Sequence, residues 1–268
     1  MINIRTALGK NPAFETEILL CHALNKNRAY LFAHPEELLT QTQLEVYQKL
    51  MAKRAQGIPI AYLTGEREFW SLNLKVNQHT LIPRHETERL VELALEHIPN
   101  QANTYILELG TGSGAIALAL AKERPHWQII ACDISEEALN IAKENAQILK
   151  INNVSFYQSN WFNKIPQRLY HAIVSNPPYI AEQDPHLQEG DLCFEPRNAL
   201  VSSQEGLADL QYIINQGHKY LLPNGLILLE HGFDQKFKVR TILNELRYKN
   251  VQCWQDLQGQ DRVSGGWR

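Results

Sequence analysis

Short apolar runs alternate with helical segments beyond about residue 100. Five runs rich in Ile, Val and Leu have the character of strands buried on both faces of a sheet, and they cover residues 105–109, 128–134, 154–158, 171–175 and 226–230. The spacing of apolar residues predicts helices between and after them, over 115–123, 135–150, 205–221 and 237–248. Residues 251–268 are expected to add two strands joined through Gly259. This alternation predicts a doubly wound α/β sheet.

The first 70 residues have a different pattern, in which apolar residues recur at helical spacing. The segment from Phe14 to Ala23 follows a helix start signal at Asn11 and Pro12. A second helix is expected after a capping box over residues 42–45. We interpret residues 1–70 as a small helical bundle.

A β-hairpin is predicted between these two regions. Leu72, Leu74 and Val76 alternate with polar residues, as in a strand with one buried face, and residues 77–79 are expected to turn into a second strand through Leu81. The expected organisation is therefore a helical bundle over 1–70, a hairpin linker over 71–84 and an α/β domain over 85–268.

Composition restricts the classes of partner. The chain has 268 residues, 26 basic and 29 acidic, so its formal net charge of −3 gives no overall positive field for nucleic acid, although a local basic patch stays open. The four cysteines are too far apart for a zinc or redox motif, which favours reduced thiols. Neither a signal-peptide core nor an apolar run of membrane-spanning length is present. We expect a soluble cytoplasmic protein, a monomer without membrane attachment.

A glycine-rich segment follows the first predicted strand of the sheet. Gly110, Gly112 and Gly114 allow a sharp turn and bring backbone N–H groups close to a ligand at the start of the next helix. With Ala115 in the last small position, the segment fits a dinucleotide fingerprint as well as an S-adenosylmethionine site. A turn selected only for packing is the structural alternative.

Asp133 ends the second predicted strand. An acidic side chain there can accept hydrogen bonds from both hydroxyls of a ribose. Its alternative role is to stabilise the N-terminus of the helix that begins at Ser135. Together with the glycine-rich segment, Asp133 favours a nucleotide-like cofactor.

The tetrapeptide at 176–179, Asn-Pro-Pro-Tyr, indicates the chemistry. An amide or exocyclic amine nitrogen is a poor nucleophile because its lone pair is conjugated. If the Asn176 side-chain oxygen and the Pro177 carbonyl each accept one N–H, they favour a pyramidal nitrogen that attacks a methylsulfonium carbon. Pro177 and Pro178 hold these acceptors in place, while Tyr179 offers a face for stacking. The motif favours S-adenosylmethionine over NAD, and its structural alternative is a turn that ends the strand.

Other polar residues give weaker signals. No metal site is predicted, because the histidines lack metal-ligand spacing; those considered are His85, His186 and His231. Glu195 and Arg197 are candidates for the mouth of a substrate site or for an exposed ion pair. Glu230, at the end of a predicted strand, is a candidate for buried support or for a pocket wall.

These motifs closely resemble those of the HemK/PrmC family of protein-(glutamine-N5) methyltransferases. The similarity covers nearly the whole chain, and the matching segments are 69–70, 81–84, 86–88, 108–114, 133, 159–162, 175–179, 184–186, 194–196 and 229–232. The resemblance implies a Rossmann-like S-adenosylmethionine-dependent methyltransferase domain. It implies that the substrate is the glutamine of the Gly-Gly-Gln motif in class I peptide chain release factors. The bundle over 1–70 fits this function as a surface that recognises a folded protein, and its structural alternative is an appendage that only stabilises the enzyme.

Roles of individual residues also follow from the resemblance. The residues implied at the cofactor are Gly110, Thr111, Gly112, Ser113, Gly114, Asp133, Trp161 and Asn176. The residues implied at the glutamine are Asn176, Pro177, Pro178 and Tyr179, of which Asn176, Pro177 and Tyr179 are the catalytic candidates. Asn160 stands where relatives often carry Asp, but its amide oxygen can still accept a hydrogen bond from an adenine amine.

Two other functional classes share part of this pattern. A nucleic-acid amino-methyltransferase uses the same tetrapeptide, but the acidic balance and the lack of an evident basic recognition segment argue against direct nucleic-acid binding. A release-factor-binding protein without activity would not need an intact Asn-Pro-Pro-Tyr sequence. An enzyme that methylates glutamine is the favoured prediction.

Overall fold

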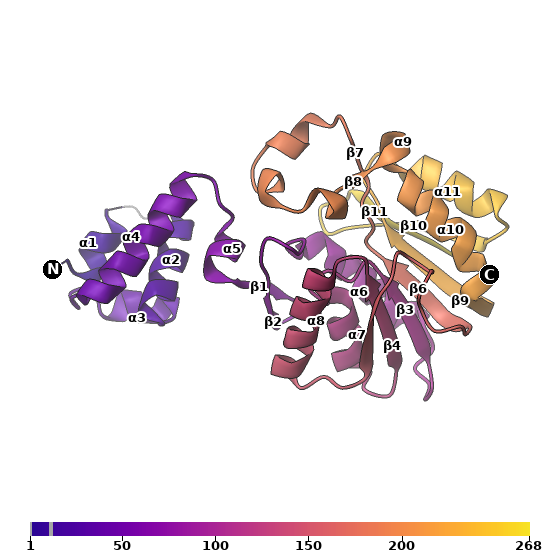
Figure 1. The fold of residues 1–268 in the computed structure, drawn as a ribbon, viewed down its shortest axis with the longest axis horizontal. Helices are drawn as coiled ribbons and strands as arrows, with labels where there is room; N and C mark the ends of the chain where they lie inside the picture. The colour runs from indigo at the N-terminus through magenta and orange to yellow at the C-terminus, as the bar shows by residue number, and fades with distance from the viewer. Residues whose placement is uncertain (1, 11–12) are drawn as a thin grey trace.

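The computed structural model describes residues 2–10 and 13–268, and Figure 1 shows a group of helices lying to one side of a large α/β sheet. The helices of this bundle are α1 (Ile4–Leu8), α2 (Phe14–Leu24), α3 (Arg28–Ala33), α4 (Gln41–Ala55) and α5 (Ile60–Thr64). Buried residues such as Leu19, Leu31 and Tyr47 give the bundle a core of its own. The start signal predicted at Asn11 and Pro12 lies outside the described residues.

The cap of the longest bundle helix differs from the prediction. Thr40, rather than a residue of the predicted 42–45 box, caps α4, and its hydroxyl accepts the backbone N–H of Gln43 while the Gln43 side chain accepts the Thr40 N–H. Both four-residue windows have a suitable sequence, so the prediction was wrong by two positions.

A hairpin is confirmed, but its predicted turn and the predicted strand through Leu81 are wrong, because the strand of Leu72 and Leu74 pairs with the segment before it. It consists of β1 (Glu66–Phe69) and β2 (Leu72–Lys75), with the turn at Trp70 and Ser71 instead of 77–79. Both turn residues have positive φ angles, 52° and 56°, which is uncommon for residues other than glycine. Acidic side chains from outside the turn stabilise it, since Glu88 accepts the Trp70 N–H at 3.0 Å and Glu68 accepts the Ser71 N–H at 2.6 Å.

Seven strands form the main sheet, in the order β10-β11-β9-β6-β3-β4-β5. Their bounds are β3 (Tyr105–Leu109), β4 (Gln128–Asp133), β5 (Val154–Gln158), β6 (Tyr170–Ser175), β9 (Leu221–Glu230), β10 (Lys249–Gln255) and β11 (Asp261–Trp267). The pairs from β9 through β5 are parallel, and β10 and β11 add an antiparallel end. All five predicted core strands are confirmed, with β9 beginning earlier than expected.

Helices cover both faces of this sheet, which confirms the doubly wound fold. One face packs against α6 (Glu88–His97) and α7 (Ala115–Glu123), and the other against α10 (Ala208–Tyr220) and α11 (Lys236–Glu245). The predicted helix over 205–221 is α10, preceded by the short α9 (Ser203–Gly206), whereas α6 was not predicted. Among the described residues, none of the helices combines the length and the apolar character needed to cross a membrane.

A buried asparagine ties the hairpin to the sheet domain. Asn145 of α8 (Glu136–Leu149) accepts the Lys75 N–H at 2.7 Å and donates to the Lys75 carbonyl at 3.0 Å. It also donates to the Ser113 carbonyl in the glycine-rich loop at 2.9 Å. One side chain therefore joins α8, β2 and the loop.

We predict that Asn145→Ala lowers the free energy of unfolding by about 2 to 4 kcal/mol, because it leaves buried backbone groups of Lys75 and Ser113 without partners. Asn140→Ala is the matched control, since Asn140 is exposed on the same helix and should change the free energy by less than about 0.5 kcal/mol. Urea denaturation measures both. Equal stability of the two variants would mean that the Asn145 contacts do not hold the hairpin.

Candidate active site

The predicted site residues gather where parallel strands end. Leu109 of β3 is in register with Cys132 of β4 and with Ser175 of β6, so the segments after these strands leave the sheet at one edge. A cavity of about 300 Å³ lies there. The predicted residues in its wall are Gly110, Gly112, Asp133, Trp161, Asn176 and Pro178.

The glycine-rich loop shapes this cavity through its backbone conformation. Gly110, Gly112 and Gly114 have φ angles of 73°, 54° and 86°, in the region that favours glycine. Thr111 and Ser113 line a neighbouring cavity of about 40 Å³. Gly114 lines neither cavity; it precedes α7 as the N-cap, and a Cβ there would lie 3.1 Å from Leu118 and 3.2 Å from Ala142.

Asp133 lies at the start of α8, as considered for its structural role, and also contacts the glycine-rich loop. Its Oδ1 accepts the Ser135 N–H at 3.0 Å, at the start of α8, and its Oδ2 accepts the Gly112 N–H at 2.8 Å. Burial raises the pKa of Asp133, and these N–H groups act in the opposite direction. Because each carboxylate oxygen has a second lone pair, the side chain can still accept two ribose hydroxyls from the cavity.

Trp161 is held in the cavity wall by a network that the sequence did not reveal. Its ring lies 3.6 Å from the position of a Cβ on Gly110, and its Nε1 donates to Asp209 at 3.2 Å. Asp209 also accepts the Ser202 hydroxyl at 2.6 Å. Asn160 lines the same cavity. The indole is thus fixed at its N–H, and its ring forms part of the cavity wall.

Asn176 lines each of the three cavities described at this edge of the sheet. Besides the larger one, it lines a cavity of about 60 Å³ together with Pro177, Tyr179 and Arg84. Its Nδ2 donates to the Thr87 hydroxyl at 3.2 Å, which leaves Oδ1 as the acceptor of this side chain. A ligand in the larger cavity and a small planar group in the other would therefore meet at Asn176.

Two buried carboxyl groups flank the strand that carries Asn176. Glu108 of β3 accepts the Thr111 hydroxyl at 2.6 Å, and Glu230 of β9 accepts the Tyr179 hydroxyl at 3.2 Å. Burial raises the pKa of Glu108 to about 8 and the pKa of Glu230 to about 7. Glu230 is therefore buried support for Tyr179. The signal for both residues was an acidic residue inside an apolar strand.

Glu195 is part of a buried pair rather than an exposed one. It accepts the Ile82 N–H at 2.9 Å and forms an ion pair with Arg84, not with Arg197 as considered from the sequence. Burial raises the pKa of Glu195, and the charge of Arg84 lowers it. The pair holds Arg84 beside the smaller cavity.

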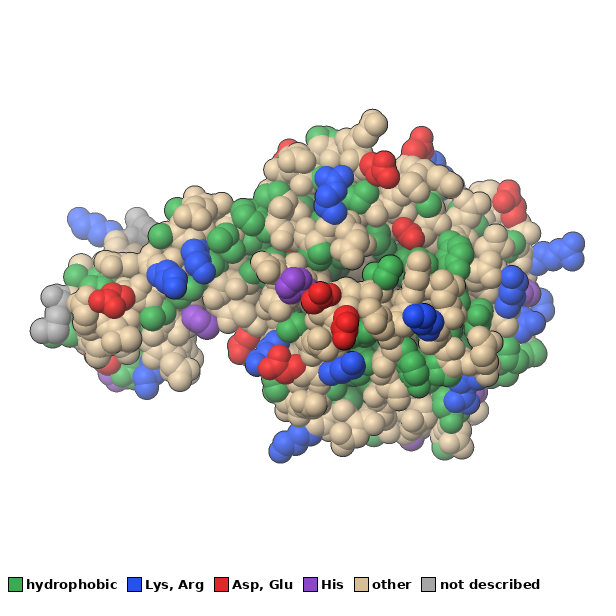
Figure 2. Space-filling model, viewed as in Figure 1, with side chains coloured by type: hydrophobic (Ala, Val, Ile, Leu, Met, Phe, Trp, Pro, Cys, Tyr) green, Lys and Arg blue, Asp and Glu red, His purple; other side chains and the backbone are tan. Residues whose placement is uncertain are grey.

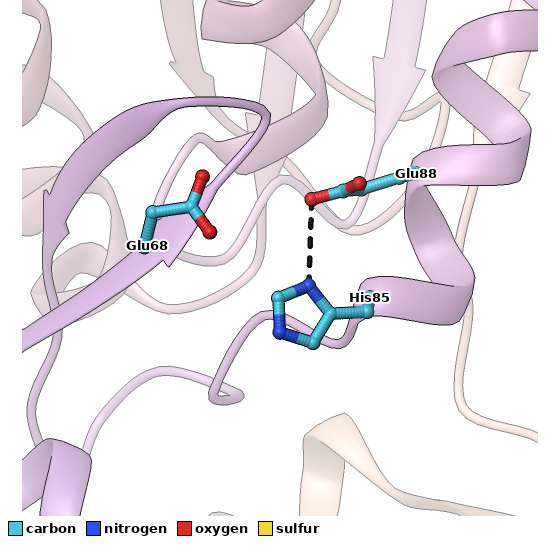
Figure 3. Close-up of side chains that lie close together, drawn as sticks. All are labelled: Glu68, His85 and Glu88. Carbon is cyan, nitrogen blue, oxygen red and sulfur yellow. Dashed lines mark ion pairs between the residues drawn. The ribbon is translucent and has the colours of Figure 1, made fainter.

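Figure 3 shows a cluster that the sequence spacing did not indicate, in which Glu68, His85 and Glu88 point toward one another. Ligand atoms of the three side chains lie within 4.8 Å of one another. Both carboxylates already accept N–H groups of the hairpin turn, from Ser71 and Trp70. We therefore assign the cluster a structural role and place no metal there.

Comparisons with known proteins agree with this geometry. Residues 84–252 match the family model "Methyltransferase small domain", and residues 4–65 match "PrmC N-terminal domain". The chain is 50% identical over 260 residues to the release factor glutamine methyltransferase of Shewanella oneidensis, covering 97% of this chain and 91% of the relative. It is 49% identical over 259 residues to the release factor glutamine methyltransferase of Aliivibrio fischeri, covering 96% of this chain and 91% of that relative.

The solved structures support the fold alone. A methyltransferase from Pyrococcus furiosus aligns with a TM-score of 0.55 at 16% sequence identity, over 82% of this chain and 98% of that one.

Proposed function

This chain belongs to the release factor glutamine methyltransferases, and we propose that it transfers a methyl group from S-adenosylmethionine to a glutamine side-chain nitrogen. The proposed acceptor is the N5 atom of the glutamine in the Gly-Gly-Gln motif of class I peptide chain release factors. The observation that carries this proposal is the position of Asn176 in the walls of both cavities.

The larger cavity fits the methyl donor. Asp133 offers acceptors for ribose hydroxyls, and the fixed ring of Trp161 offers a surface for adenine. Gly110 and Gly112 leave room for the donor along the loop, while Thr111 and Ser113 line the adjoining small cavity. S-adenosylmethionine supplies a methyl group on a positively charged sulfur, an excellent leaving group that requires neither a metal nor a strong base.

The smaller cavity fits the amide of the glutamine. The Asn176 Oδ1 atom and the Pro177 carbonyl are the two acceptors that orient the NH2 group, and Tyr179 bounds the same cavity. Pro177 and Pro178 keep these acceptors in place before the substrate arrives, so little reorganisation accompanies the reaction. The residues contribute orientation, and the proton of the methylated nitrogen can leave afterwards.

A groove beside the site supports a protein substrate. Its volume is about 1,150 Å³, and it is lined by Phe14 and Arg54 of the bundle, Arg67 of the hairpin and Asp191. Arg84 lines both this groove and the smaller cavity, so the two share a wall residue. We propose that the bundle recognises the release factor here, with the division at 1–70, 71–84 and 85–268 as the working domain plan.

A nucleic-acid substrate is the less favoured alternative. Figure 2 shows acidic and basic side chains interspersed over the face that it presents, and the formal net charge is −3. Neither observation indicates a basic surface that would bind the phosphates of a nucleic acid. We propose that the enzyme acts in the cytoplasm as a monomer, without binding nucleic acid or membrane.

We predict that Asp133→Ala weakens S-adenosylmethionine binding by roughly 1 to 3 kcal/mol, because the ribose hydroxyls lose a charged partner. Asp133→Asn keeps one acceptor oxygen, but its NH2 group would face the N–H of Gly112 or Ser135, so this variant should weaken binding as well. Isothermal titration calorimetry measures both variants. Unchanged affinity in Asp133→Ala would remove this residue from the cofactor site.

Asn176→Ala should lower the methylation rate by about 100- to 1,000-fold, because it removes an acceptor that orients the reacting nitrogen. Cofactor affinity should change far less, and Asn176→Asp should be milder because a carboxylate still accepts an N–H bond. The measurement is single-turnover labelling of a release factor carrying Gly-Gly-Gln. A normal rate in Asn176→Ala would refute the mechanism, and labelling that persists after replacement of the motif glutamine would refute the substrate.

Removing residues 1–65 tests the bundle while leaving both strands of the hairpin in place. The expected result is a turnover of the whole release factor that is about 10- to 100-fold lower, because contacts in the groove are lost. Cofactor affinity and the rate with a short Gly-Gly-Gln peptide should change little. If the peptide and the whole protein lose rate equally, the bundle is not a recognition surface.

A further inference from the structure

The strand register places Glu230 beside Asn176. Ser175, the last residue of β6, is in register with Leu229 of β9, so Asn176, which follows β6, lies level with Glu230, the last residue of β9. Glu230 is 1% exposed. A buried carboxylate thus lies next to the residue that is proposed to orient the substrate.

Thr87 provides the connection between these two residues. It ends the short helical turn η1 (His85–Thr87) and is buried, and its Oγ1 accepts a hydrogen bond from Asn176 Nδ2 at 3.2 Å. A hydroxyl that accepts one hydrogen bond can still donate its own proton. The acceptor that we assign to this proton is the buried Glu230 Oε2 atom, which has no other partner among the described residues; Thr87 also lowers the pKa of Glu230, which agrees with this assignment.

The other described groups around Glu230 leave one of its carboxylate oxygens free to accept a hydrogen bond from the Thr87 hydroxyl. Tyr179 donates to Oε1 at 3.2 Å, and among the described residues Oε2 has no partner within strict hydrogen-bond geometry. Arg262 of β11 favours the charged form from a distance, because its own contacts are with Asp256 and the His231 carbonyl. Glu86 opposes it.

We propose that Thr87 and Glu230 are positioning residues that fix the orientation of the Asn176 amide. Ionised Glu230 accepts a hydrogen bond from the Thr87 hydroxyl. The Thr87 oxygen is then free to accept a hydrogen bond from Asn176 Nδ2, and Asn176 Oδ1 points toward the substrate nitrogen. This inference rests on the proposed glutamine methylation. It extends the site to the buried Glu230 and to Thr87, which lines the cavity of about 40 Å³ beside Asn176.

The opposite orientation of the amide would be unproductive. If the Thr87 proton pointed at Asn176, it would pair with Oδ1 and turn the NH2 group of Asn176 toward the substrate. Two NH2 groups would then face each other without an acceptor between them. The direction of one hydroxyl therefore decides whether the substrate NH2 group is oriented for attack.

The first test compares two substitutions at Thr87. Thr87→Val keeps the shape but removes the hydroxyl, and the single-turnover rate with a Gly-Gly-Gln release factor is expected to fall by about 10- to 100-fold. Thr87→Ser keeps the hydroxyl and should restore the rate to within about 3-fold of the original enzyme. Equal rates for Thr87→Val and the original enzyme, or equal losses in both variants, would overturn the proposal. A parallel loss of cofactor affinity in Thr87→Val would overturn it as well, since the residue would then support the cavity.

The second test uses pH. Because the pKa of Glu230 is about 7, the rate of the original enzyme should fall as the pH drops through that value and Glu230 becomes protonated. Glu230→Gln resembles the protonated form, so its rate should be low and should lack this acidic limb. Glu108 is present in both the original enzyme and Glu230→Gln, so any effect of its titration on the rate is common to the two pH profiles. An acidic limb with the same midpoint in Glu230→Gln would contradict the role of Glu230, and the Thr87 pair provides an independent answer if this variant does not fold.

The original enzyme in the same assay separates this inference from the proposed function. If it does not label the Gly-Gly-Gln factor, glutamine methylation itself is wrong. If it labels that factor and Thr87→Val does so equally fast, only the positioning role is wrong.

Discussion

The parallel pairing of β6 with β3 on one side and with β9 on the other determines the site. Parallel strands in register end at the same edge of the sheet, so the segments after β3 and β6 and the end of β9 meet there. The glycine-rich loop, Asn176 and Glu230 come from segments far apart in the chain, yet each occupies this edge because of the strand that precedes it or contains it. This is the usual place for a ligand in an open α/β sheet.

Burial at this edge gives the polar groups their properties. Glu108 and Glu230 are almost without exposure, and burial is the largest cause of their raised pKa values. Each carboxyl group is held by a hydroxyl, from Thr111 and from Tyr179 respectively. Removing such groups from water makes each remaining hydrogen bond directional and costly to lose. A site of this kind catalyses by orientation, as expected for a reaction whose leaving group is already activated.

The fold was largely predictable, because the buried strands are short runs rich in Ile, Val and Leu; residues 105–109 were identified to the residue despite the acidic Glu108 among them. The hairpin turn could not be placed, because Trp70 and Ser71 carry no turn signal and depend on carboxylates from elsewhere. Most of the site residues that motifs predicted line the cavities. Their supports, such as Thr87 and Glu230, depend on contacts between distant segments, and only the fold reveals these.

The most direct test of the account is a crystal structure of the enzyme with S-adenosylhomocysteine and a Gly-Gly-Gln release factor. The account predicts that the glutamine nitrogen lies about 2.7 to 3.2 Å from both Asn176 Oδ1 and the Pro177 carbonyl, with the cofactor ribose at Asp133. Asn176 Nδ2 should still face Thr87. A glutamine amide bound away from Asn176, or a cofactor outside the cavity at the ends of β3 and β4, would contradict it.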